Sequence, residues 1–216
     1  METGFLARSY HDDQGVEQRY TVFVPAAYDP EQTWPAIFFM HGAGERGTDN
    51  QSQLTVGLGP VVKSQEGLFP AITFFPQMRT DWSKNHHDLA RALAELDQVQ
   101  REFNIDEDRI YVTGLSMGGH GTWAAVQRCP GRFAAAVAVC GFFDHNVEPF
   151  TSLPCWFFHG TDDSVVPVRH SRKAVAAIRS AGGNPKYTEF PGVDHDSWIQ
   201  SYDTPELYDW LFAQRR

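Results

Sequence analysis

The stretch VTGLSMGGHG, residues 112–121, places one serine among four glycines where a strand is followed by a helix. The apolar segment before it predicts the strand, and the alanine-rich segment after it has helical character. Gly114, Ser116 and Gly118 fit the pattern G-x-S-x-G, in which a sharp turn exposes a serine hydroxyl above a sheet. Glycine is required at both places because a side chain there would collide with the neighbouring strand and helix. The segment therefore predicts that Ser116 is a nucleophile.

Outside this segment, apolar runs alternate with helical patterns. Continuous apolar runs that end in turn signals occupy residues 36–42, 71–77, 109–114, 134–141 and 153–160, and an alternating strand pattern occupies 17–25. Helical patterns occupy residues 87–103, 168–183 and 204–216, where Thr204 is expected to cap the last helix before Pro205. This alternation predicts an α/β fold with a mostly parallel central sheet and helices on both faces. Functional side chains are expected where the strands end.

Length and charge limit the classes of function. The 216 residues suit a single domain, 1–216, with no internal repeat or linker. With 27 acidic and 18 basic residues the net charge is -9, which argues against nucleic acid or an anionic membrane as a partner. The apolar run 133–143 is too short to cross a bilayer.

The N-terminus and the cysteines bear on the cellular compartment. No signal peptide is visible at the N-terminus, so we expect a cytoplasmic protein, while a secreted form with its signal removed stays open. The three cysteines, without a CxxC pattern, are expected to be reduced thiols and not metal ligands.

A serine hydroxyl needs a base to take its proton, and the sequence offers nine histidines. His195 follows the last predicted strand, in a loop that can reach Ser116. His170 is the alternative, but it lies in the first turn of a helix, only a few residues from the candidate acids. His41 and His159 end strands immediately before glycine, and we expect them to brace loops. His145 is expected in a surface loop.

The imidazole in turn needs an acid that holds its tautomer. Asp162 and Asp163 follow the apolar run 153–160 and precede His195. Ser116, Asp163 and His195 then follow the order nucleophile, acid, base, which is found in hydrolytic sites built on this class of fold. One residue of the aspartate pair is expected to be functional and the other to be an exposed loop acid.

Two backbone N–H groups are expected to stabilise a developing oxyanion. The first belongs to Met117, directly after the candidate nucleophile. The second is expected in the loop HGAGERG, residues 41–47, where Ala43 is the preferred donor and Gly44 the second choice. Arg46 is expected to hold this loop by charge-assisted hydrogen bonds.

In this combination of motifs the chain resembles the α/β-hydrolases. Within that fold it resembles small bacterial carboxylesterases known as predicted peptidases, relatives of feruloyl esterases, polyhydroxybutyrate depolymerases and dienelactone hydrolases. The resemblance covers about Phe38 to Trp198 and rests on HGAGERGTDN, FFPQ with the downstream Trp82, GLSMGGHGTW, and HGTDDSVVPV followed by GVDHDSW.

The resemblance also decides between the two aspartates. The family pattern HGxxDxxVP puts the acid four residues after the histidine, at Asp163. One departure is His120, which stands where the family pattern has tyrosine, and this puts the substrate preference in doubt. Dienelactone hydrolases use a cysteine nucleophile, so Ser116 argues against that activity.

The sequence therefore predicts a serine carboxylic-ester hydrolase that works through an acyl-serine intermediate, with no cofactor and no metal. No large cap domain is expected, because only about ten residues, 142–152, separate two strands where caps are usually inserted. We expect short-acyl or aryl esters, including feruloyl-type esters, as small-molecule substrates. The predicted pocket residues are Trp82, His120, Phe142 and Phe143.

Two other functions stay open at this point, together with the oligomeric state. A serine peptidase of the same fold is one alternative, although such peptidases usually carry an extra domain. A non-catalytic binding protein on this fold is the other, although such proteins typically lose the serine or the histidine. We expect a monomer or a small homo-oligomer.

Overall fold

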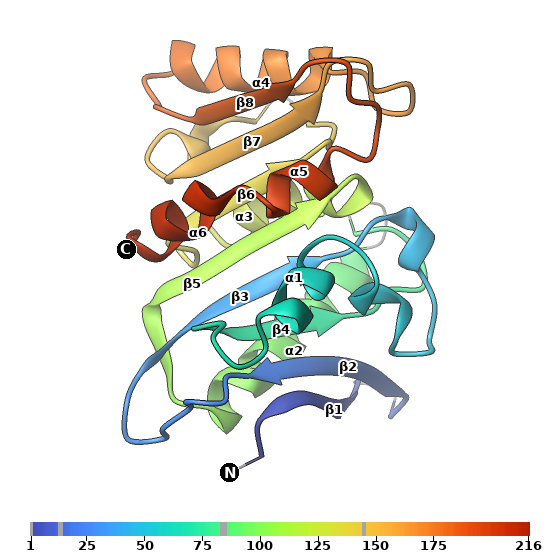
Figure 1. Cartoon of the computed structure of the whole chain (residues 1–216), viewed down its shortest axis with the longest axis vertical. Helices are drawn as coiled ribbons and strands as arrows, with labels where there is room; N and C mark the ends of the chain where they lie inside the picture. The colour runs from blue at the N-terminus through green and yellow to red at the C-terminus, as the bar shows by residue number, and fades with distance from the viewer. Residues whose placement is uncertain (1, 13–14, 83–85, 144–145) are drawn as a thin grey trace.

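One eight-stranded sheet forms the centre of the computed structural model, which describes residues 2–12, 15–82, 86–143 and 146–216 (Figure 1). The strands are β1 (Gly4–His11), β2 (Glu17–Val24), β3 (Trp34–Met40), β4 (Ile72–Pro76), β5 (Ile105–Leu115), β6 (Ala135–Val139), β7 (Cys155–Gly160) and β8 (Lys186–Phe190). Their order across the sheet is β1-β2-β4-β3-β5-β6-β7-β8. Only the β1–β2 and β2–β4 pairs are antiparallel, which confirms the predicted mostly parallel sheet.

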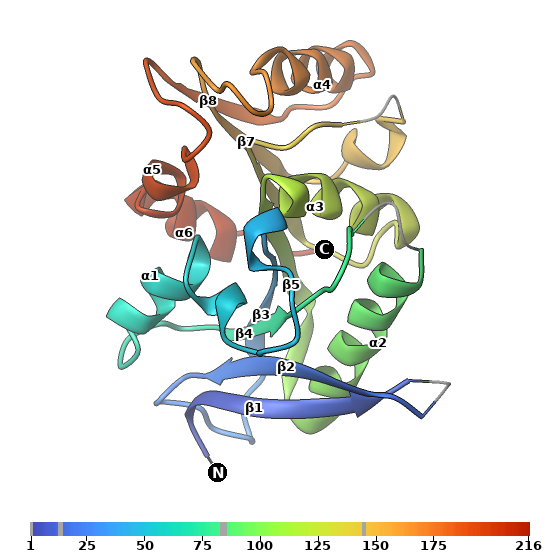
Figure 2. The ribbon, with the colours of Figure 1, turned by 90° about the vertical axis from the view of Figure 1, so that its right-hand side faces the viewer.

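Helices cover both faces of this sheet, as predicted. The helices are α1 (Leu58–Ser64), α2 (His86–Glu102), α3 (Met117–Arg128), α4 (Arg169–Ser180), α5 (Trp198–Tyr202) and α6 (Pro205–Phe212), with short 3₁₀ turns η1 (Ala43–Glu45), η2 (Ser52–Leu54) and η3 (Glu148–Phe150). Viewed along the sheet edge, α2, α3 and α4 lie on one face and α1, α5 and α6 on the other (Figure 2).

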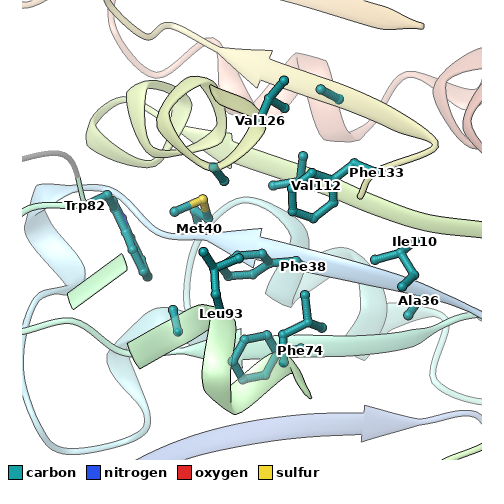
Figure 3. Close-up of a cluster of buried hydrophobic side chains, with 14 of the residues drawn as sticks. Ala36, Phe38, Met40, Phe74, Trp82, Leu93, Ile110, Val112, Val126 and Phe133 are labelled. Atoms are coloured by element: carbon teal, nitrogen blue, oxygen red, sulfur yellow. The ribbon is translucent and has the colours of Figure 1, made fainter. Parts of the chain in front are cut away.

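Each face of the sheet has its own hydrophobic core. Successive residues of a strand point to opposite faces, so Phe38 and Phe74 pack under α2 and α3 while Phe39 and Phe75 pack under α1 and α5. The first of these cores also contains Trp123, and Figure 3 shows part of it, with Leu93 of α2 beside Phe38 and Phe74. Burial on both faces explains why the central strands have continuous apolar sequences.

Some elements differ from the expectations. Strand β1 was not predicted, because GFLARSYH at the sheet edge is only half buried and lacks a strong apolar pattern. Thr204 is the residue before α6, but its hydroxyl donates to the Gln200 carbonyl (2.8 Å) and does not cap the helix. His145 lies outside the described residues. Within the described ranges, every helix is too short or too polar to cross a membrane.

Candidate active site

Ser116 stands alone between a strand and a helix, because β5 ends at Leu115 and α3 begins at Met117. Its backbone has φ 53° and ψ −116°, a strained conformation for a residue with a side chain. Two backbone hydrogen bonds hold it: the Ser116 N–H donates to the Val139 carbonyl (2.9 Å), and the His120 N–H donates to the Ser116 carbonyl (3.2 Å). The hydroxyl is thereby fixed at the carboxyl end of β5.

The two glycines of the turn have no room for a side chain. A Cβ at Gly118 would overlap the carbonyl oxygen of Met40 on β3, and a Cβ at Gly114 would overlap the carbonyl oxygen of Gly118. Strand β3, strand β5 and helix α3 therefore meet at backbone contact. This close approach is the physical reason for the G-x-S-x-G spacing.

His195 reaches Ser116 from the loop after β8. The distance from its Nε2 to Ser116 Oγ is 2.9 Å, and its Nδ1 lies 2.8 Å from Asp163 Oδ2. An ionised carboxylate only accepts hydrogen bonds, so Nδ1 carries the proton and Nε2 accepts the serine O–H. The alternative base, His170, lies in the first turn of α4. The chain thus brings Ser116, His195 and Asp163 into one line of hydrogen bonds.

The two neighbouring aspartates have different surroundings. The Asp163 side chain is fully buried, and its Oδ1 accepts the backbone N–H groups of Val165 (2.9 Å) and Val166 (2.7 Å). Asp162 is exposed, and its Oδ1 accepts the hydroxyl of Thr161 (2.8 Å). Of these two aspartates, Asp163 is the one that contacts the His195 ring, in agreement with the register of the HGxxDxxVP pattern.

Sequence reasoning missed Asp194, which joins the acid loop to the base loop. Its Oδ1 accepts the backbone N–H of Ser164 (2.8 Å), the hydroxyl of Ser164 (2.9 Å) and the backbone N–H of His195 (2.8 Å). These hydrogen bonds, first of all the one from the Ser164 N–H, lower the pKa of the Asp194 carboxyl. A carboxyl next to the candidate base was the one signal that could have pointed to it.

The predicted oxyanion donors lie on either side of the serine. Met117 is the first residue of α3, so its N–H points out of the positive end of the helix. Ala43 begins the 3₁₀ turn after β3, and a Cβ on the preceding Gly42 would lie 3.7 Å from the Cβ of Ser116. The loop therefore runs past the nucleophile. Arg46 holds it as expected, since its Nε donates to the Ala43 carbonyl (2.8 Å).

The predicted role of Trp82 in the pocket is wrong. Its ring is fully buried against Phe38 and the His41 ring, on the core side of the sheet (Figure 3). Its indole N–H donates to the His41 carbonyl (2.8 Å), so the polar end of the side chain is occupied by the protein backbone. Trp82 supports the loop that carries Ala43 and presents no face to a substrate.

The other three predicted pocket residues separate into two groups. His120, in the first turn of α3, and Phe142 are half-buried, and their rings lie 4.0 Å apart. The His120 backbone N–H also contacts the Ser116 carbonyl. Phe143 was also predicted there, but its ring packs on Trp123 (5.1 Å) and Phe157 (5.2 Å) in the core. That prediction is wrong because consecutive residues after a strand point in different directions.

One group of side chains in the described part of the chain has ligand atoms spaced closely enough for a metal ion. It consists of Cys140, Asp163 and His195, whose atoms lie within 4.8 Å of one another. Burial raises the pKa of the Cys140 thiol to about 12, which keeps it protonated and a weak ligand. The other two side chains already bind each other, so the arrangement suits proton transfer better than metal binding.

The chain matches known hydrolases in sequence. The phospholipase/carboxylesterase family matches residues 69–204. A bifunctional acetylxylan esterase/xylanase of Neocallimastix patriciarum is 26% identical, over 73% of this chain and 23% of its own length. The carboxylesterase SOBER1 of Arabidopsis thaliana is 23% identical, over 81% of this chain and 88% of its own. The chain thus spans less than a quarter of the first relative and most of the second.

A solved structure has the same fold over nearly all of this chain. The crystal structure of a thermostable esterase is 40% identical, with a TM-score of 0.91 over 98% of this chain and 63% of that one. The fold is therefore that of the α/β-hydrolases, as the motifs implied. With a family match over more than half of its residues, the chain belongs to the phospholipase/carboxylesterase family.

Proposed function

We propose that this chain is a serine carboxylic-ester hydrolase in which Ser116 is acylated. The observation that carries the proposal is the continuous line of hydrogen bonds Ser116–His195–Asp163, at 2.9 and 2.8 Å. Family membership and the esterase relatives support the same reaction. In this proposal residues 1–216 act as a single hydrolase domain.

The residues of the site divide the proposed mechanism among them. His195 Nε2 accepts the Ser116 proton while Oγ attacks the acyl carbon, and the N–H groups of Met117 and Ala43 bind the oxyanion. His195 then donates the proton to the leaving alcohol, which leaves an acyl-serine. Water attacks this ester with His195 again as base. Asp163 holds the imidazole tautomer and stabilises its positive form.

For the substrate we propose short-acyl or aryl esters, including feruloyl-type esters. The acetylxylan esterase relative supports a small acyl group. The half-buried rings of His120 and Phe142 pack on each other, and His120 lies one helical turn after Ser116, so we propose that this ring surface receives a flat group. A matched amide should be a poor substrate, and this comparison separates an esterase from a serine peptidase of the same fold.

The first prediction tests the nucleophile. Ser116→Ala should fold normally and lose about a thousandfold or more in kcat, because no side chain can form the acyl intermediate. A fluorophosphonate probe should label the wild type and not this variant, as intact mass spectrometry can measure. The control is Ser180→Ala, an exposed serine at the end of α4, which should be labelled and active. Normal ester hydrolysis by Ser116→Ala would reject the proposal.

A further inference from the structure

A second histidine contacts the candidate acid. His159 is at the end of β7, its side chain is fully buried, and its Nε2 lies 3.1 Å from Asp163 Oδ2. The same nitrogen is 2.7 Å from the carbonyl oxygen of Val166. His159 was expected only to brace a loop, yet it shares one carboxylate oxygen with His195.

The hydrogen bonds around His159 fix its tautomer. Both neighbours of Nε2, the Val166 carbonyl and the Asp163 carboxylate, only accept hydrogen bonds, so Nε2 carries a proton. On the other side of the ring, Nδ1 lies 2.7 Å from the hydroxyl of Ser171, a buried residue of α4 that can donate to it. Burial lowers the pKa of His159, which favours the neutral ring. The side chain is therefore a neutral N–H donor that faces both the Val166 carbonyl (2.7 Å) and Asp163 Oδ2 (3.1 Å).

This donor completes the set of N–H groups around the carboxylate. Oδ1 accepts two backbone N–H groups of its own loop, Oδ2 accepts the imidazole N–H of His195, and the protonated Nε2 of His159 lies 3.1 Å from the same Oδ2. Three of these donors lie on loops, whereas His159 belongs to β7, a strand paired with β6 on one side and β8 on the other. A donor on a rigid element can fix the orientation of a carboxylate that loop residues alone would leave free to tilt.

We propose that His159 is a positioning residue that holds Asp163 in the geometry required to orient His195. The inference rests on the proposed function, since it concerns the acid of the same triad. His159 touches neither the substrate nor the nucleophile in this mechanism and acts through Asp163. Ser171 has an indirect part, because it keeps the ring of His159 in the tautomer that donates from Nε2.

Three variants test this role with p-nitrophenyl acetate as the substrate. His159→Leu removes the donor with little change in volume and should lower kcat by about 10- to 100-fold, because small displacements of catalytic groups have effects of this size. KM should change less than about threefold, since binding is untouched. His159→Gln keeps an N–H donor and should restore kcat to within about fivefold of the wild type. Ser171→Ala should lower kcat about three- to tenfold.

A double-mutant cycle with Asp163→Asn separates positioning from simple stability. If His159 acts through Asp163, His159→Leu should lower kcat less than about threefold in the Asp163→Asn background. Two results overturn the proposal: an equal loss in both backgrounds, or a lowered melting temperature with unchanged kcat. If His159→Leu does not fold, Ser171→Ala takes its place in the cycle, and an unchanged kcat for that variant overturns the proposal.

The same assays distinguish this inference from the proposed function. Normal turnover by Ser116→Ala would reject the proposed triad, and the proposed role of His159 would be rejected with it. An inactive Ser116→Ala, a slow Asp163→Asn and a normal His159→Leu would reject the positioning role alone.

Discussion

Two residues of the candidate site region, Ser116 and Cys140, have strained backbone conformations. In the described ranges, three residues other than glycine have positive φ angles: Asn50 (55°), Ser116 (53°) and Cys140 (41°). Ser116 and Cys140 follow the ends of β5 and β6, where the backbone turns out of the sheet. Each donates its N–H to the next strand, to Val139 and Phe158 respectively (2.9 Å each). The neighbouring strand thus stabilises each strained turn, as expected where geometry must be exact enough for chemistry.

The second prediction compares the two adjacent aspartates. Asp163→Asn should lower kcat by about 10⁴, because the amide no longer holds His195 in the tautomer that accepts the serine proton. Asp162→Asn serves as the matched control and should change kcat less than about threefold, since its carboxylate is exposed and accepts the Thr161 hydroxyl. Ester hydrolysis assays with both variants measure the two effects. A reversed order would show that the acid had been assigned one residue too far along the chain.

The loop between β3 and η2 shows how an element is held in place for a backbone donor. The neutral ring of His41 donates from Nδ1 to the Gly42 carbonyl (2.7 Å) and accepts the Met78 N–H at Nε2 (2.9 Å). Gln77, the last residue of the FFPQ motif, donates to the Glu45 carbonyl (3.0 Å) and accepts the Asn50 N–H (2.7 Å). Two motifs of the resemblance therefore have one structural task, which is to fix the loop that carries Ala43.

The third prediction concerns the contact between α3 and β3. Gly118→Ala should lower the melting temperature by several degrees or prevent folding, because its methyl group would overlap the Met40 carbonyl. Gly67→Ala is the control, since nothing lies within 4 Å of the position that its methyl group would take and its φ is not positive. Thermal unfolding followed by circular dichroism measures both. Equal melting temperatures for the two variants would contradict this packing of α3 on β3.

The fourth prediction concerns a buried ion pair on α2. Arg91 donates to Glu95 Oε1 (2.8 Å), yet the Glu95 side chain is fully buried and its Oε2 has no hydrogen-bond partner among the residues that the structure describes. Burial raises the Glu95 pKa from 4.5 to about 7. The folded protein therefore binds a proton between about pH 4.5 and 7 that the unfolded chain has lost, so this group destabilises the fold as the pH rises through that window.

The measurement is the melting temperature of Glu95→Gln minus that of the wild type. This difference should grow as the pH rises from 5 to 7.5, reaching the order of 5 °C. His41 has the opposite effect on the pH dependence. Burial lowers the pKa of His41 to about 4, so the folded protein loses stability as the pH falls from 6.5 towards 4. His41 is present in both proteins, so its effect cancels in the difference. A melting-temperature difference that stays constant or shrinks as the pH rises would contradict the buried position of Glu95.

The elements that the sequence predicted well are those with a strong and repeated pattern. The five apolar runs became β3 to β7 because strands buried on both faces leave a continuous apolar signature. Strand β1 was missed because an edge strand packs on one side only, and its residues are half-buried. The serine, the base and the oxyanion loop were predicted because each follows a strand end. The choice of acid needed the resemblance.

The direction of a side chain was the part that local sequence did not reveal. Trp82 and Phe143 follow strand ends, but their rings turn into the core because tertiary packing offered them apolar partners and, for Trp82, a carbonyl acceptor. His159 braces the loop after β7 through the Val166 carbonyl, as predicted, but its contact with Asp163 and the hydrogen bonds of Asp194 were not predicted. These contacts depend on partners four residues and some 30 residues away, respectively, that only the folded loops bring close.

At the scale of the molecule, the candidate site results from one property of the sheet. Strands β3, β5, β6, β7 and β8 are neighbours and parallel, so their carboxyl ends meet at one edge (Figure 1). The oxyanion loop follows β3, the serine follows β5, the acid follows β7 and the base follows β8. Residues far apart in the chain thus meet without any one loop having to be long.

An open groove lies near this edge, on the face of the sheet that carries α1 and α5. A groove of about 490 Å³ lies between α1 and α5, with walls that include Val61, Trp198 and Ile199. The Trp198 ring stands edge-on against the His195 ring, at 5.5 Å, so the groove adjoins the candidate base. Ile199 is 60% exposed, which leaves this apolar wall open to solvent. A short or flat group can rest there, while a long chain would extend past the wall into water.

The fifth prediction follows from this open shape and is measured with p-nitrophenyl esters of increasing acyl length. Each methylene that becomes buried contributes roughly 0.8 kcal/mol to binding, so an enclosed acyl tunnel would raise kcat/KM steadily out to long chains. In an open groove that gain ends once the chain leaves the apolar wall, and we expect a maximum between acetyl and butyryl. The rate with Ser116→Ala, subtracted for each ester, removes uncatalysed hydrolysis. A maximum at palmitoyl would contradict the open site, because only a chain buried along most of its length gains affinity with every added methylene.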